Sequence, residues 1–326
     1  MDIKKELPSG KLSPEALERN VLGYSGAENK NLLIGPAVGE DAAVIKWDSG
    51  KYMIFASDPI SGASKGAGKL LVRVNSNDIA SKGGDPLYMT VTLILPPETG
   101  EEGAAAIMKE VHEECLAQGI SVAGGHTEFN DLYTRPVIMA ALVGEADRVY
   151  DARNIEAGDY ILVTKHIGIE GMSILAADKK ELLSDFMSEE ETEELLSWGE
   201  MTSVLNDSRV VRKYAKFMHD PTEGGFYGGL GEITSLCGLE AEIDTAKIPL
   251  HPLTVRASEK LGFDPLHLIA SGSLLAVIEK DSLPQAEEAL RKADIPYAVI
   301  GKMGGKLTKK PEEPKEELWR LLKMEK

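Results

Sequence analysis

Residues 74–96, VNSNDIASKGGDPLYMTVTLILP, hold the pattern that decides the fold. In their second half every other side chain is apolar, and these side chains are Leu87, Met89, Val91, Leu93 and Leu95. The side chains between them, which point the opposite way, are Tyr88, Thr90 and Thr92. A period of two is typical of a strand that is buried on one face. We therefore predict a half-buried strand at 87–95, with one face on a core and the other on something more polar.

The segments on both sides of this strand alternate between strand and helix patterns. Further strands are predicted at 42–47, 51–57, 136–144, 160–164, 274–280 and 297–301. Helices are predicted at 101–118, 169–178, 201–217, 222–237 and 284–293, with a short one in the tail and a solvated acidic helix or loop at 188–194. The polar, turn-rich stretch 147–159 places a boundary near residue 153. The sequence thus predicts a mixed α/β (α+β) protein with two domains, 1–153 and 154–326.

Charge and cysteine content exclude several classes of protein. The chain has 36 Lys and Arg against 53 Asp and Glu, a net charge of −17, so we expect no nucleic-acid or membrane partner. No stretch approaches the ~20 apolar residues of a membrane span, and the start, MDIKKELPSG, lacks the apolar run of a signal peptide. Cys115 and Cys237 occupy apolar positions of helical patterns, which favours two buried thiols in a reducing compartment. We expect a soluble cytoplasmic protein.

Candidate site residues gather in four short segments of the first half: Gly39-Glu40-Asp41, Ser57-Asp58-Pro59, residues 75–78 (NSND) and residues 124–128 (GGHTE). Each segment puts a carboxylate where a strand ends or a helix begins. One such aspartate alone is most simply a helix cap or a turn residue. Four together, each beside glycine or asparagine, indicate a site for a nucleotide and Mg²⁺, because the ion takes oxygen ligands and glycines let backbone amides approach phosphates.

Two further segments leave alternatives open. Residues 63–70, ASKGAGKL, are not a true phosphate-binding loop, since Ala63 and Leu70 replace the glycine and the hydroxyl residue that it needs. Lys65 and Lys69 in this flexible glycine-rich segment either reach phosphates or are exposed loop lysines. Residues 219–225, HDPTEGG, precede a predicted helix. They are either a capping segment, with Thr222 or Asp220 as N-cap, or an anion or substrate site at the helix N-terminus.

Taken in order, seven segments resemble one family of enzymes. The segments are GEDAAVI (39–45), ASDP (56–59), GAGKLL (66–71), residues 74–96, GGHTE (124–128), KHIGIEG (165–171) and HDPTEGG (219–225). The family is that of aminoimidazole ribonucleotide (AIR) synthetase (PurM-like), and it includes thiamine-monophosphate kinase, selenophosphate synthetase and the hydrogenase maturation protein HypE. HypE is the member that the chain resembles most. The resemblance implies two α/β domains and a homodimer in which the first domains form a β-barrel-like centre with ATP near the interface. It also implies ATP-dependent phosphate transfer to an oxygen of a small substrate.

The resemblance also implies roles for particular residues. Asp41, Asp58 and Asp78 match the magnesium-binding acids of the family. The positions that match its nucleotide-binding or catalytic groups are Lys69, Asn77, Gly124, Gly125 and, at the domain junction, Asp220. We therefore expect ATP and Mg²⁺ as cofactors, with Lys69 and Asp220 as the catalytic residues.

The chain departs from the family at several positions. His126 stands where the family has an acid, which Glu128 could replace, and Glu223 stands where HypE has an arginine. The sequence ends LLKMEK, without the terminal cysteine that carries the carbamoyl group of HypE, and residues 270–273 (ASGS) lack an acid that HypE has nearby. We therefore expect an ATP-dependent kinase or synthetase related to HypE that acts on another, unidentified substrate. Two alternatives remain, a nucleotide-binding or maturation-associated protein without turnover and a structural protein without a ligand.

Overall fold

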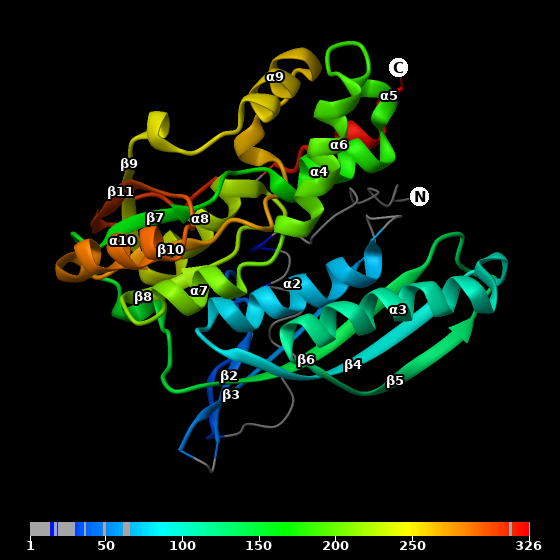
Figure 1. Cartoon of the computed structure of the whole chain (residues 1–326). Coiled ribbons are helices and arrows are strands. Elements are labelled where there is room, and N and C mark those ends of the chain that lie inside the picture. Colours follow the sequence, from blue (N-terminus) through cyan, green and yellow to red (C-terminus); the bar gives the residue numbers. More distant parts are fainter. Residues whose placement is uncertain are drawn as a thin grey trace, which may run out of the picture.

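The structure, a computed structural model, describes residues 14–15, 18, 30–35, 37–47, 50–60, 66–312 and 315–325. In this part of the chain the strands form two sheets (Figure 1). The first has the strand order β1-β2-β3-β6-β4-β5, and the second has the order β8-β10-β7-β11-β9. All strands of the first sheet precede those of the second in the sequence. The domain division at 153/154 stays a prediction.

The first sheet consists of β1 (Leu32–Ile34), β2 (Ala43–Lys46), β3 (Tyr52–Ile60), β4 (Asp85–Leu95), β5 (Ser121–Phe129) and β6 (Val137–Ala146). Its pairings are antiparallel, except that β5 pairs with β4 in parallel. The predicted strands at 42–47, 51–57, 87–95 and 136–144 are confirmed. Strand β5 was not predicted, because an edge strand with every residue but one exposed has no buried face to give it a period of two.

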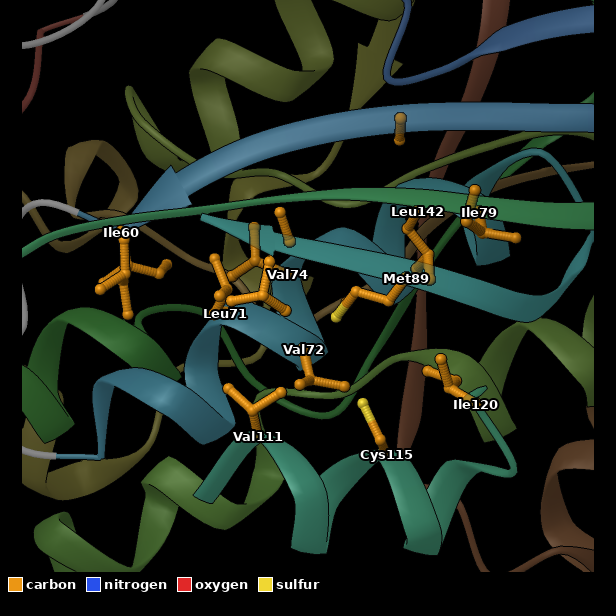
Figure 2. Packing of buried hydrophobic residues seen from close by; sticks show 14 of the residues in the cluster. Ile60, Leu71, Val72, Val74, Ile79, Met89, Val111, Cys115, Ile120 and Leu142 are labelled. Carbon is orange, nitrogen blue, oxygen red and sulfur yellow. The ribbon is translucent and has the colours of Figure 1, made fainter. Parts of the chain in front are cut away.

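Two helices cover one face of this sheet, α2 (Ala67–Ser81) and α3 (Gly100–Gln118) (Figure 1). Figure 2 shows how Val72 of α2 lies close to Val111 and Cys115 of α3, while Met89 and Leu142 come from the strands. All of these side chains are buried at 2% exposure or less. The prediction of a helix at 101–118 is confirmed, and Gly119 ends it in a left-handed conformation with φ 76°.

Helix α2 corrects the expectation of a flexible segment around Lys69. Every residue from Leu71 to Ser81 is buried, so the helix has no polar face that an amphipathic pattern could reveal. Gly68 lets α2 approach α3 closely, since a Cβ atom there would lie 2.5 Å from the carbonyl oxygen of Ile107. Asp78 consequently lies inside a helix, neither at a strand end nor at a helix start as expected.

The second sheet consists of β7 (Tyr160–Thr164), β8 (Ala215–His219), β9 (Leu239–Ile243), β10 (Leu275–Ile278) and β11 (Tyr297–Lys306), all paired antiparallel. The helices around it are α4 (Ile169–Asp178), α5 (Lys180–Leu183), α6 (Glu189–Ser197), α7 (Leu205–Val211), α8 (Gly225–Cys237), α9 (Pro252–Leu261), α10 (Leu283–Lys292) and α11 (Leu318–Leu322). The acidic stretch 188–194 is a helix, capped by Ser188 and Glu191.

One prediction for the second half is wrong, and the structure also excludes one alternative that the sequence left open. Residues 201–217 are not one helix, because α7 ends at Val211 and β8 begins at Ala215. The run AKFMH is short and almost wholly buried, and such a run has no periodicity that separates strand from helix. The N-cap of α8 is Gly224 rather than Thr222 or Asp220.

The C-terminal half of α2 docks the two sheets onto each other. The side-chain amide of Asn77 donates to the carbonyl oxygen of Thr202 (2.9 Å) and accepts from the backbone N–H of Val204 (2.9 Å). The Ser208 hydroxyl donates to the carbonyl oxygen of Ala80 at 2.6 Å. These bonds satisfy polar groups that would otherwise be buried without partners, so the position of one sheet is fixed relative to the other.

Both cysteines are free thiols, and only Cys115 is fully buried, whereas Cys237 is half-buried. Burial raises the pKa of the Cys115 thiol to about 11, so it is protonated and unreactive at neutral pH. None of the helices that the structure describes is long and apolar enough to cross a membrane.

Candidate metal centre at the domain junction

The three acids predicted to bind metal, Asp41, Asp58 and Asp78, line one cavity of about 280 Å³, which we call the acid cavity. Asp41 precedes β2, Asp58 lies within β3 and Asp78 lies within α2, so Asp58 also departs from the expectation of a strand end. Asn75 of α2 ties the helix to β3, because its amide accepts from the Asp58 backbone N–H (2.9 Å) and donates to the Asp58 carbonyl oxygen (3.2 Å). Thr222 and the carboxylates of Glu40 and Glu232 also line the cavity.

Asp220, which follows β8 directly, adds a carboxyl group from the second half of the chain. It is 1% exposed, and its Oδ1 accepts a hydrogen bond from the Ser81 hydroxyl of α2 at 3.0 Å. Its Oδ2 is buried and has no hydrogen-bond partner among the described residues. Burial, together with the nearby charge of Asp41, raises the pKa of Asp220 to about 8.

His219 is a central residue that sequence reasoning missed. Its Nδ1 lies 2.6 Å from Oδ2 of Asp41, and its Nε2 lies 2.7 Å from Oε2 of Glu232. Ionised carboxylates only accept hydrogen bonds, so both ring nitrogens must donate and the ring is an imidazolium. Burial opposes the charge, but the two carboxylates outweigh it and raise the pKa of His219 to about 10. The sequence feature that could have indicated a role for His219 is its position directly before Asp220, at the start of the HDPTEGG segment.

Lys82 is a second cation that the sequence did not reveal. It is 1% exposed, pairs with the Glu40 carboxylate, and its Nζ lies 4.6 Å from the centroid of the Phe217 ring. Burial raises the pKa of Glu40, although Lys82 works against this shift. Near the cavity, the carboxyl groups of Glu40, Asp41, Asp58, Asp78, Asp220 and Glu232 therefore outnumber the cations Lys82 and His219.

This arrangement fits a hard divalent cation. Ligand atoms of Asp41, His219 and Asp220 lie within 4.8 Å of one another. Both nitrogens of His219 are already used by carboxylates, so the groups left to hold an ion are the oxygens of the aspartates. Carboxylate oxygens are the ligands that Mg²⁺ prefers, and the unpartnered Oδ2 of Asp220 is one that the fold leaves available.

The other predicted site residues lie elsewhere in the single chain. Nζ of Lys69 lies 3.1 Å from Glu200, and Lys69 lines a different cavity, between α2 and α4. The Asn77 amide is used in docking the two sheets. Gly124 and Gly125 belong to the exposed edge strand β5, and Lys65 lies outside the described residues.

The departures at 126 and 128 also lie on β5, where both side chains are well exposed. Nε2 of His126 lies 3.2 Å from Oε2 of Glu128. This hydrogen bond lowers the pKa of Glu128, which stays an exposed carboxylate. Neither residue lines the acid cavity in the part of the chain that the structure describes.

The fold and the cavity define a two-domain α/β protein whose acidic centre is assembled from both halves of the chain. Residues 39–146 match the AIR synthase related protein N-terminal domain, and residues 156–310 match the corresponding C-terminal domain. The chain therefore belongs to the AIR synthase related protein family, and the predicted resemblance and two-domain fold are confirmed.

Individual relatives agree with this assignment. The carbamoyl dehydratase HypE of Cupriavidus necator is 27% identical over 248 residues, which are 73% of this chain and 69% of the relative. The selenide, water dikinase of Bordetella bronchiseptica is 30% identical over 254 residues, 74% of this chain and 70% of the relative.

Solved structures share the fold. The structure of AaThiL complexed with AMPPCP and TMP superposes with a TM-score of 0.70 at 20% identity, covering 86% of this chain and 92% of that one. The structure of hydrogenase maturation protein HypE in complex with ATP gives a TM-score of 0.67 at 19% identity, covering 90% and 84%. At these identities the likeness establishes the fold alone.

Proposed function

We propose that this chain binds ATP with Mg²⁺ at the acid cavity and transfers phosphate to an oxygen of a small substrate. The observation that carries the proposal is the convergence of Asp41, Asp58 and Asp78 from one domain with Asp220 from the other. A buried carboxylate oxygen without a partner costs ~1–3 kcal/mol, and a bound cation would remove that cost. Relatives described as complexes with ATP or AMPPCP support the nucleotide.

The residues divide into two roles. Asp41, Asp58 and Asp78 hold Mg²⁺, which when bound would neutralise charge on the phosphate oxygens. Asp220 adds its buried Oδ2, which makes no hydrogen bond in the described structure, as a further oxygen for the ion from the second half of the chain, and its pKa of about 8 makes it a poor proton acceptor at neutral pH. His219 keeps Asp41 oriented through the 2.6 Å contact.

The first test is calorimetric titration of ATP with and without Mg²⁺ into the unmodified protein and two variants. Asp78→Asn keeps the side-chain shape but removes the charge, and we expect it to abolish Mg²⁺-dependent ATP binding. Asp281→Asn, at an exposed position, is the matched control and should bind as the unmodified protein does. Equal ATP affinity in both variants would remove the acid cavity as the nucleotide site.

ATP binding without turnover is the second candidate. The observation that favours it is the imidazolium of His219, which engages an Asp41 oxygen that a metal ion would need. An assay for ADP release over a panel of small hydroxyl and carboxylate acceptors separates the two candidates. ADP release above background supports phosphate transfer, whereas tight ATP binding without any release supports the second candidate.

We also propose that a second copy of the chain covers the open face of the first sheet. Tyr88 of β4 lies opposite Val143 of β6, which in turn lies opposite Phe55 of β3. Tyr88 is 55% and Phe55 is 44% exposed, so this row forms an apolar surface on the face away from α2 and α3. Such a surface marks an interface, and a partner there would bring a second β5, with its Gly124 and Gly125, toward the site.

Light scattering after gel filtration tests the dimer. The unmodified protein should elute with twice the chain mass of 35.2 kDa, and Tyr88→Glu should elute as a monomer. Leu132→Glu, at a position that is 84% exposed outside this row, is the control and should stay dimeric. A monomeric unmodified protein would contradict this part of the proposal.

A further inference from the structure

A third cavity lies at the end of β7, where the KHIGIEG motif begins, and it is separate from the acid cavity. Its volume is about 370 Å³, within the range of small-molecule pockets, and it has no lining residue in common with the acid cavity. Most of its wall is apolar and consists of Pro249, Leu250, Pro252, Ile295 and Pro296. The proposed phosphate transfer uses none of these residues.

Backbone strain is concentrated at this cavity. Among the described residues, the non-glycine residues with positive φ are Lys165 and Asp294, each at 55°, and both line the cavity. Asp294 follows the end of α10, where aspartate tolerates this conformation. Lys165 has no such local reason, so its conformation is strain that the surroundings impose, and such strain gathers at ligand sites.

Lys165 has no donor left for an anionic ligand. Its Nζ donates to the carbonyl oxygens of Ser203 (2.7 Å) and Met201 (3.3 Å) and to Oδ2 of Asp207 (3.2 Å). An ammonium group has three N–H bonds, and all three are used. The effect of Lys165 is therefore to hold the Asp207 carboxylate in place.

Asp207 holds a buried acceptor that no described residue satisfies. The residue is 4% exposed and lines the cavity, and its Oδ1 is buried without a hydrogen-bond partner in the described part of the chain. Asp294 adds a second carboxylate to the lining. With one ammonium against two carboxylates, the charged groups of the cavity carry a net charge of −1, which favours a cationic ligand with N–H donors.

Aromatic rings form the remaining side. The ring centroid of His166 lies 4.5 Å from that of Trp198 and 5.3 Å from that of His251. Burial and the neighbouring His251 lower the pKa of His166 to about 4, so its ring is neutral at physiological pH. Nδ1 of His251 accepts the backbone N–H of Leu253 at 3.3 Å. The three rings are inclined at 41° to 80° to one another, and His166 and His251 line the cavity, so these two offer polarisable ring surfaces that an aromatic cation can contact.

We propose that this cavity binds a small planar organic cation, an aromatic amidine or amine, whose N–H groups donate to the Asp207 carboxylate. In this proposal the ring of the ligand lies between the His166 ring and the cavity wall formed by Pro249, Pro252 and Pro296. The proposal does not depend on ATP binding at the acid cavity.

The test is calorimetric titration of the full chain with benzamidine and with benzoate, which have the same shape and opposite charge. Benzamidine should bind at millimolar concentration, and benzoate should not. Asp207→Asn should lower the affinity for benzamidine at least about tenfold, because the charge-assisted hydrogen bond between the amidinium and the carboxylate is lost. Since Asp207→Asn also disturbs Lys165, Pro296→Trp serves as a second variant, which fills the cavity from an exposed position and should also abolish binding.

Three results would each overturn the proposal. One is that titration of benzamidine into the unmodified protein gives no heat of binding. Another is that benzoate binds the unmodified protein as tightly as benzamidine does. The third is an unchanged benzamidine affinity in Pro296→Trp. Asp78→Asn should bind benzamidine normally, and this result separates a failure here from a failure of the proposed ATP site.

Discussion

Replacing Glu316 by glutamine should change how the stability of the protein depends on pH. The Glu316 carboxylate accepts from the backbone N–H groups of Gly224 and Leu318, both at 2.7 Å, and of Ile269 at 3.3 Å. It therefore caps the start of α8, at the two glycines that end the HDPTEGG segment. Burial nevertheless outweighs these hydrogen bonds and raises the pKa of Glu316 from 4.5 to about 7.

The sign and size of the effect follow from this shift. A carboxyl group whose folded-state pKa is raised stabilises the fold below its unfolded pKa, and this stability is lost as pH rises through the folded pKa. A rise from 4.5 to about 7 corresponds to at most about 3 kcal/mol. Of this, about 2 kcal/mol is lost between roughly pH 5.5 and pH 8.5. Glutamine does not titrate, so Glu316→Gln removes this loss.

The assay is urea unfolding followed by tryptophan fluorescence, with the unmodified protein and Glu316→Gln measured at several pH values in that interval. The free energy of unfolding of the unmodified protein should fall relative to the variant by about 2 kcal/mol as pH rises. Asp220, with a pKa of about 8, titrates in both proteins and cancels in the difference. Glu312→Gln, at an 87% exposed side chain, should show no pH-dependent difference. A constant offset between the unmodified protein and Glu316→Gln would refute the reasoning.

Two further substitutions test the packing around the candidate site by urea unfolding. Gly125→Ala should cost about 1–3 kcal/mol, because its Cβ would lie 1.9 Å from a carbonyl oxygen of β4. Gly124→Ala meets nothing within 4 Å and should cost less, so an equal cost would mean that the close approach of β4 and β5 is not the cause. Lys82→Met should cost about 3–5 kcal/mol, because it leaves Glu40 without its buried cation. Lys46→Met, at an exposed position, should change stability by less than about 0.5 kcal/mol, and a similar value for Lys82→Met would make that ion pair dispensable.

Contrast of burial between two faces accounts for two of the predicted elements. Strand β4 alternates buried and exposed residues, and α3 buries one stripe that includes Val111 and Cys115. Such contrast is what a periodicity measures. Helix α2 and strand β8 are buried on nearly all sides, so their sequences carry no contrast, and both were missed. Strands β7 and β10 are equally buried and were still predicted, because a short apolar run is consistent with a buried strand but does not prove one.

The candidate site divides in the same way. Asp41, Asp58 and Asp78 could be predicted because short polar residues beside glycine or asparagine are a local signal. The sequence pointed to His219 only through the HDPTEGG segment that it begins, and it did not point to Lys82, since the contacts of these residues are with residues 178 and 42 positions away. A histidine or lysine in the sequence gives no sign of whether it will be exposed or buried between carboxylates.

The buried polar run of α2 has a physical explanation that joins fold and site. Asn75 binds the backbone of β3 beside Asp58, Asn77 binds the 202–204 segment, and Ser81 donates to Asp220. Asp78, between them, faces the acid cavity. The Asn75 amide is satisfied within the first half of the chain, whereas the Asn77 amide and the Ser81 hydroxyl make these bonds only when both halves are docked, and an unmade buried bond costs ~1–3 kcal/mol. The helix therefore sets the position of the acids from both domains together, and neither domain alone would contain the complete centre.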